Sequence, residues 1–235
     1  MWWVALFFAN EMLVNPVLGI DILHDSSDPG AAFDSQDHYD RRCFPGTREQ
    51  YIADITNWVT ESVDPPSSMY WMRGPAGVGK SAIAQTCAER LKETGHLGAA
   101  FFFTVNKHSN ASRLFTTIAY QLATTLPDYR TSIDERISRD ETLVEKKMPF
   151  QFRSLIVDPI QELGKQGKRV QQKAIFIDGF GRVCWWRRSS RNYQDNCILR
   201  QGRIYPIPLG YLQPRGTSHR IDIQAGQHYS CHSFY

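Results

Sequence analysis

One short loop constrains the fold of this chain more than any other feature of its sequence. Residues 74–81 read Gly-Pro-Ala-Gly-Val-Gly-Lys-Ser and satisfy the pattern G-x-x-x-x-G-K-[ST]. The apolar run 68–73 before the loop has the length of a strand, and the spacing of Ile83, Cys87 and Leu91 after it predicts a helix. A strand, a glycine-rich turn and a helix in this order are typical of a loop whose backbone N–H groups hold phosphate.

The residue types in and near this loop point to a nucleoside triphosphate with Mg²⁺. Glycines let the backbone approach phosphate oxygens, the Lys80 ammonium reaches the β- and γ-phosphates, and the Ser81 hydroxyl ligates the metal. An acid at the tip of a neighbouring strand completes such a site, and Asp178 follows the apolar run 174–177. The alternatives are a turn that only caps a helix and, for Asp178, a strand-end turn residue. The candidate nucleotide-binding residues are Gly74, Pro75, Ala76, Gly77, Val78, Gly79, Lys80, Ser81 and Ala82; the candidate metal ligands are Ser81 and Asp178, and no catalytic residue is assigned.

Strand-length apolar runs alternate with helical patterns across the middle of the chain. Thr47 and Gln50 have the spacing of a capping box, which predicts a helix with Thr47 as N-cap and an end near Asp64. This alternation predicts an α/β fold of three layers with a parallel sheet. Further strands are predicted at 97–105 and 174–178, and further helices at about 114–122, 128–139 and 150–164.

The N-terminal part of the sequence predicts no regular structure. Residues 1–9 are strongly apolar, but the run is shorter than the roughly 18 apolar residues of a membrane span. The first basic residue is Arg41, which disfavours a signal peptide and leaves a docking segment or a misassigned start. Residues 21–46 are rich in Asp, Ser, Gly and Pro and predict an extended linker. We therefore expect an irregular segment and linker over 1–42 and a nucleotide-binding domain over 43–179.

The charge of the chain changes abruptly after this domain. Residues 1–181 hold 19 Lys+Arg and 22 Asp+Glu, whereas residues 182–235 hold 8 and 2. The arginines of the second part are scattered among Pro and Gly without helical spacing, so we expect no nucleic-acid partner. The five cysteines include no C-x-x-C pair, which favours reduced thiols and a cytoplasmic protein. No membrane association is expected.

Five segments together resemble a known family. They are PGTREQ at 45–50, YWMRGPAGVGKSAIAQT at 70–86, GAAFFFTVNKHSN at 98–110, LFTTIAYQLA at 114–123 and KAIFIDG at 173–179. This set is similar to the NACHT-type P-loop NTPase domain of the STAND class, in particular to the nephrocystin-3-like N-terminal domain found in many fungal proteins. The resemblance implies a regulatory switch that binds ATP or GTP with Mg²⁺ and associates with itself or with other NACHT proteins. It also implies that Arg48 lies near the base and ribose.

The chain departs from that family pattern directly after Asp178. The family continues D-G-L-D-E, where the second acidic pair activates the attacking water, but here Arg182 follows Phe180 and Gly181, and the next carboxylate is Asp195. Arginine cannot accept a proton from water at neutral pH, so we expect weak hydrolysis or none. Codons for this stretch, read one base further on, permit L-D-E-C. We hypothesise that residues 180–235 are an irregular basic tail in a shifted frame.

This departure also bears on the sheet. In the family, the strand after this acid lies between the loop strand and the acid-bearing strand. We therefore expect an incomplete parallel sheet and a marginally stable chain unless the tail supplies a strand. The preferred function is nucleotide binding by a regulatory switch. The alternatives are a non-enzymatic interaction fragment that associates with full-length relatives and, with less support, a small-molecule phosphotransferase.

Overall fold

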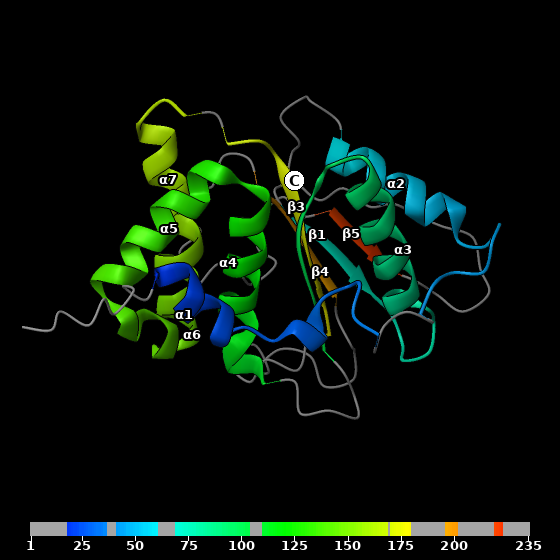
Figure 1. Ribbon diagram of the computed structural model, residues 1–235. Coiled ribbons are helices and arrows are strands. Elements are labelled where there is room, and N and C mark those ends of the chain that lie inside the picture. The colour runs from blue at the N-terminus through cyan, green and yellow to red at the C-terminus, as the bar shows by residue number, and fades with distance from the viewer. Residues whose placement is uncertain are drawn as a thin grey trace, which may run out of the picture.

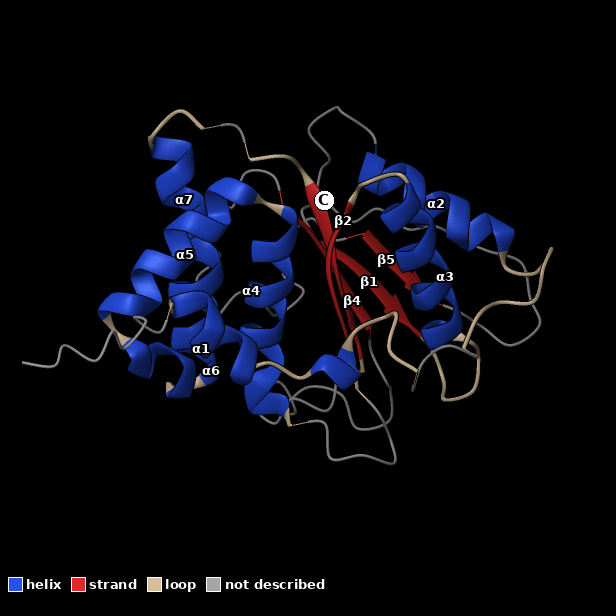
Figure 2. Ribbon diagram, in the orientation of Figure 1, coloured by secondary structure: helices blue, strands red, loops and turns tan. Residues whose placement is uncertain are grey.

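A five-stranded sheet runs between two groups of helices (Figures 1 and 2). The computed structural model describes residues 18–36, 41–60, 69–103, 110–168, 170–179, 196–201 and 219–222. The result is a mixed α/β structure that is mostly helical. None of the described helices has the length and apolar character needed to cross a membrane.

The sheet is mixed in direction. Its strands, in spatial order, are β2 (Leu97–Phe102), β3 (Lys173–Asp178), β4 (Asn196–Gln201), β1 (Met69–Arg73) and β5 (His219–Asp222). Strands β2 and β3 pair in parallel, as do β1 and β5, whereas β4 is antiparallel to both of its neighbours. The expectation of a purely parallel, incomplete sheet is therefore corrected: an antiparallel strand from the tail lies between β3 and β1.

The sequence predicts an irregular tail, and this prediction is wrong for two of its segments, because residues 196–201 and 219–222 are strands. Two strands that flank a gap present rows of N–H and C=O groups, and a third strand can satisfy them through its backbone whatever its side chains. Residues 196–201 contain neither proline nor glycine, so every position can take part in a ladder. The proline-containing stretch 204–209 lies outside the described residues.

Helices α2 (Glu49–Thr60) and α3 (Lys80–Glu93) cover one face of the sheet (Figure 2). The stripe that the sequence predicts on α2 is confirmed, since Tyr51, Ile55 and Val59 are all buried in this core. Trp58 lies with its ring 5.5 Å from that of Tyr70 on β1. The core on this side therefore joins α2 and α3 to the strand that leads into the glycine loop.

A larger group of helices covers the other face. It is centred on α4 (Leu114–Thr125), whose apolar stripe packs against β2, and on α5 (Pro127–Arg139), which packs against α4. A continuous helical stretch follows, made of α6 (Met148–Gln151), the π-helical segment Phe152–Val157 and α7 (Asp158–Lys165). Pro159 lacks the N–H group that a regular α-helix would bond to the carbonyl of Leu155, and the Tyr129 hydroxyl donates to that carbonyl instead. The predicted helices near 114–122, 128–139 and 150–164 are confirmed. Three short 3-10 helices, Pro29–Ala31, Ala111–Arg113 and Glu141–Glu145, complete the helical elements of the described part.

Two expectations about the region before β1 are wrong. The described residues of 21–46 are not an extended linker throughout, because α1 (Gly19–Asp25) packs on α4 and α5 and buries Ile20 and Leu23. Side chains of α5 cap its first turn: Asp134 Oδ1 accepts from the Ile20 N–H at 2.8 Å, and Ser138 Oγ accepts from the Gly19 N–H at 3.1 Å. A linker composition thus forms a helix because α5 supplies the N-cap that its own sequence lacks.

The capping box is also absent. Helix α2 begins at Glu49, while the Thr47 hydroxyl donates to the carbonyl of Phe44 at 2.6 Å and the Gln50 amide donates to Asp54 at 2.9 Å. Arg48 precedes the helix with φ of 60°, and its carbonyl accepts the Ile52 N–H at 3.1 Å, so Arg48 and not Thr47 stands at the N-cap position. A tight turn at 44–47 takes the place of the predicted box.

A glutamine side chain occupies the outer edge of β2. The Gln121 amide, from α4, accepts from the Ala100 N–H at 2.8 Å and donates to the Ala100 carbonyl at 3.0 Å. Ala100 is fully buried, so water cannot satisfy these two groups. The side chain therefore provides the pair of hydrogen bonds that a neighbouring strand would make and protects this edge of the sheet.

Replacement of Gln121 by methionine should lower the free energy of unfolding by about 1–3 kcal/mol, because two buried backbone groups lose their partners. Gln50→Met is the matched control: Gln50 is exposed and bonds only to Asp54 on its own helix, so we expect a change within about 0.5 kcal/mol. Urea unfolding measures both. Equal stability of the two variants would show that the β2 edge does not depend on Gln121.

Candidate functional site

The glycine loop, residues 74–81, joins the end of β1 to the start of α3. Gly77 and Gly79 have φ of 83° and 90°, which L side chains rarely adopt. A Cβ atom at either glycine would meet nothing within 4 Å, so the backbone conformation and not the space demands glycine there. Gly79 is the N-cap of α3 and has no side chain to cover the first-turn N–H groups. The helix N-terminus is thus open to an anion.

The Lys80 side chain bends back over this loop. Its ammonium group donates to the carbonyls of Gly74 and Pro75, at 2.8 Å each, and the residue is only 4% exposed. A charge buried to this degree needs hydrogen-bonding partners, and carbonyl oxygens supply them. The loop therefore holds a positive charge next to its own backbone, and contact of Lys80 with phosphate stays a prediction.

The two predicted metal ligands come together from opposite parts of the chain. The Ser81 hydroxyl, on the first turn of α3, donates to Asp178 Oδ1, at the end of β3, at 3.0 Å across 97 residues of sequence. Asp178 is 4% exposed. A hydroxyl and a carboxylate side by side form the oxygen donor set that Mg²⁺ prefers. Among the described residues, no group of three or more His, Cys, Asp or Glu side chains is placed to hold a metal ion.

Arg48 also reaches the loop. Its guanidinium donates to the carbonyl of Val78 at 3.2 Å and lies 5.9 Å from the centre of the Tyr51 ring. The structure thus brings together Arg48, Lys80 and the Ser81–Asp178 pair, which the sequence places in three separate segments. A role for Arg48 toward a base or ribose stays a prediction, since the contact seen here is with the loop backbone.

The remaining loop residues divide into an exposed rim and a buried base. Pro75, Ala76 and Gly77 are exposed, Gly74 and Val78 are buried, and Ala82, in the first turn of α3, is half-buried. The exposed part is the side from which a ligand can approach. The buried part anchors the loop to the core that contains Val78 and Ile83.

Sequence reasoning missed how the chain before α2 is fastened to α3. Arg42 pairs with Glu89 at 2.8 Å, the Cys43 N–H donates to Thr86 at 3.1 Å, and Arg90 pairs with Glu49 at 3.0 Å. The only sequence signal is the polar face of α3. These contacts hold the segment that carries Arg48 beside the helix that follows the glycine loop.

The same region contains two cysteines, Cys43 and Cys87. Both are free thiols in the structure. Desolvation by burial raises the pKa of the Cys43 thiol and raises that of Cys87 further. Both groups therefore stay protonated at neutral pH and are poor nucleophiles there. We assign neither of them a chemical role.

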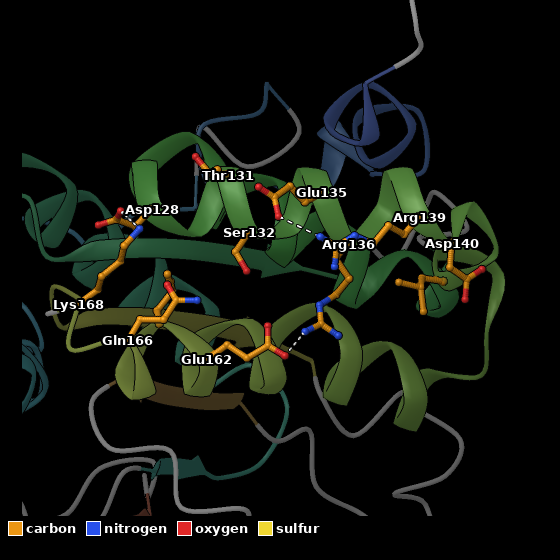
Figure 3. A pocket seen from close by; sticks show the side chains of 12 residues that line it. Asp128, Thr131, Ser132, Glu135, Arg136, Arg139, Asp140, Glu162, Gln166 and Lys168 are labelled. Atoms are coloured by element: carbon orange, nitrogen blue, oxygen red, sulfur yellow. Dashed lines mark hydrogen bonds and ion pairs between the residues drawn. The ribbon is translucent and has the colours of Figure 1, made fainter.

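A separate cavity of about 620 Å³ lies between α5 and α7 and has no lining residue from the glycine loop (Figure 3). Its charges pair with one another. Arg136 bonds to Glu162 at 2.6 Å and Lys168 to Asp128 at 2.7 Å, and both pairs link the α5 side to the α7 side. These ion pairs brace the two helices, and nothing in the cavity indicates a ligand.

Comparison with known proteins identifies the family of this domain. A family model described as Nephrocystin 3, N-terminal, matches residues 46–181, which is more than half of the 235-residue chain. The chain therefore belongs to the nephrocystin 3 N-terminal domain family. The matched range contains Arg48, the glycine loop and Asp178. Searches of curated proteins and of solved structures give no significant match.

Gly79→Ala should lower the free energy of unfolding by about 1–2 kcal/mol, because a Cβ atom is strained at positive φ even where there is space for it. Gly164→Ala is the matched control. Gly164 lies in α7, has no positive φ and would place its Cβ in open space, so alanine there should raise stability by about 0.5–1 kcal/mol. Chemical denaturation of both variants tests the opposite signs; a neutral Gly79→Ala would contradict the left-handed N-cap.

Proposed function

We propose that this domain binds a nucleoside triphosphate, ATP or GTP, together with Mg²⁺ at the glycine loop, and acts as a regulatory switch of the NACHT type. The observation that carries the proposal is the convergence of a buried Lys80, an uncapped helix N-terminus and the Ser81–Asp178 pair at one place. These are a cation, backbone N–H donors and oxygen ligands, which together match a polyphosphate and its metal.

Lys80 would bind the phosphates. At present its ammonium group bonds to two neutral carbonyls, and a charge-assisted bond to a phosphate oxygen is stronger than a bond to a neutral acceptor. The open N-terminus of α3 adds a partial positive charge on the same side. Arg48 would stabilise the loop through the hydrogen bond that its guanidinium donates to the Val78 carbonyl.

Ser81 and Asp178 would hold the metal. Mg²⁺ takes few protein ligands and completes its six positions with water and phosphate oxygens, so a hydroxyl and a carboxylate are a sufficient protein share. When bound, the ion would neutralise part of the phosphate charge. The Ser81 hydroxyl donates a hydrogen bond to Asp178 at 3.0 Å. The two oxygen atoms are therefore close enough to contact the same ion.

The switch is proposed to hydrolyse its nucleotide slowly or not at all. The sequence has no carboxylate between Asp178 and Asp195, and Arg182 stands where the resembling family has an acid. Nucleotide binding would then set the state of the protein without rapid turnover. Self-association or association with other NACHT proteins, and a cytoplasmic location, belong to the same proposal and rest on the resemblance.

Lys80→Met should weaken the binding of a fluorescent ATP analogue at least about tenfold, since the variant loses a charge-assisted bond worth about 1.5–3 kcal/mol. Lys92→Met is the matched control, because Lys92 is exposed on the same helix. Circular dichroism checks that both variants are folded. Equal affinity of the wild type and Lys80→Met would defeat the proposal and favour the non-enzymatic interaction fragment.

The metal ligands and hydrolysis need a separate test. Asp178→Asn should abolish the increase in nucleotide affinity that Mg²⁺ gives the wild type, because the amide keeps the shape of the side chain but loses its charge. Phosphate release by the wild type should stay near the uncatalysed background. Rapid turnover by the wild type would show that another group activates water.

A further inference from the structure

We propose that β4, the strand Asn196–Gln201, is a positioning element of the candidate site: it sets the spacing between the glycine loop and Asp178. The inference concerns the backbone geometry of the sheet. It rests on the proposed function only where nucleotide is taken as the ligand of the site.

The two halves are carried by strands that are not neighbours. β1 leads into the glycine loop and β3 ends at Asp178, and β4 lies between them in the sheet; Figure 1 labels the three strands. Cys197 of β4 is level with Trp71 on one side and with Ile177 on the other. Ile177 directly precedes Asp178, and Trp71 lies three residues before Gly74. The first residues of β4 therefore stand beside the ends of both strands that form the site.

The spacing that β4 imposes is about two strand widths. Adjacent strands lie about 4.8 Å apart, so two strands that flank a third are about 9.6 Å apart. Without β4, β1 and β3 would either leave rows of backbone groups unpaired or close up by about 4.8 Å. Closing up would move the end of β3 relative to the start of α3 by more than the 3.0 Å that separates Ser81 Oγ from Asp178 Oδ1, and unpaired rows would leave that spacing without support.

β5 offers an internal comparison. It pairs with β1 in parallel at the outer edge of the sheet, on the side away from β3. Loss of β5 would leave the order β3-β4-β1 intact, whereas loss of β4 would remove the only described strand that links β3 to β1. Both strands come from the same part of the chain, so a difference between them reports position in the sheet.

The test uses the full chain with one proline in each strand. Ile198→Pro falls in the middle of β4, level with Tyr70 and Phe176, and Arg220→Pro falls in β5, level with Trp71. Proline lacks the backbone N–H group and disfavours a strand in either position. Hydrogen exchange by mass spectrometry is read at 69–73, 173–178 and, as a folding reference, at α5. Affinity for a fluorescent ATP analogue is measured on the same samples.

Ile198→Pro should lose protection in both β1 and β3 and weaken nucleotide binding at least tenfold, while α5 stays protected. Arg220→Pro should leave β3 protected and change the affinity less than threefold. Ile198→Gly, which keeps the donor but weakens the strand, should give an intermediate result. Unchanged β1 and β3 protection in Ile198→Pro would overturn the proposal. So would loss of α5 protection in Ile198→Gly, because β4 would then serve folding in general.

The two proposals fail in different ways. A wild-type chain that binds no nucleotide, with or without Mg²⁺, would defeat the proposed function. The exchange data would still decide the role of β4, since protection of β1 and β3 is measured in the absence of ligand. Fast exchange of residues 196–201 in the wild type, at the rate of an unstructured peptide, would defeat the β4 proposal alone.

Discussion

Pairing of the backbone groups of β1 and β3 is the constraint on which the rest of the structure depends. These two strands carry the glycine loop and Asp178 and run parallel to one another. They do not pair directly, and β4 lies between them and pairs with both. Buried N–H and C=O groups are costly to leave without partners. Strand β4 meets this demand from the tail, in the antiparallel direction, and thereby holds the two halves of the site at their observed separation.

The loop is stabilised by the same side chains that we propose bind a ligand. Lys80 bonds to the carbonyls of Gly74 and Pro75, Arg48 bonds to the carbonyl of Val78, and Ser81 bonds to Asp178. A ligand would exchange some of these contacts for stronger, charge-assisted ones. The site can keep its shape without a ligand, since its charged side chains already have hydrogen-bonding partners that offset the cost of their burial.

Much of this could be predicted from the sequence, and the failures have physical causes. Periodicity predicted α2, α3, α4 and α5, and the motif spacing predicted the loop and its lysine. The α1 segment was predicted to be a linker because its N-cap comes from Asp134 and Ser138, more than 100 residues away. The Gln121 bonds to Ala100 were not predicted either, since no local pattern distinguishes a glutamine that covers a strand edge from one that faces solvent.

The sequence by itself determined helices α2 to α5, strands β1 to β3, the left-handed glycines of the loop, and the residue types that we propose bind phosphate and metal. These follow from local sterics and from the period of apolar residues. Only the tertiary structure decided that Ser81 meets Asp178, that Arg48 turns toward Val78 and that residues 196–201 enter the sheet antiparallel. Such outcomes depend on which distant backbone and polar groups still need partners after the local elements have formed.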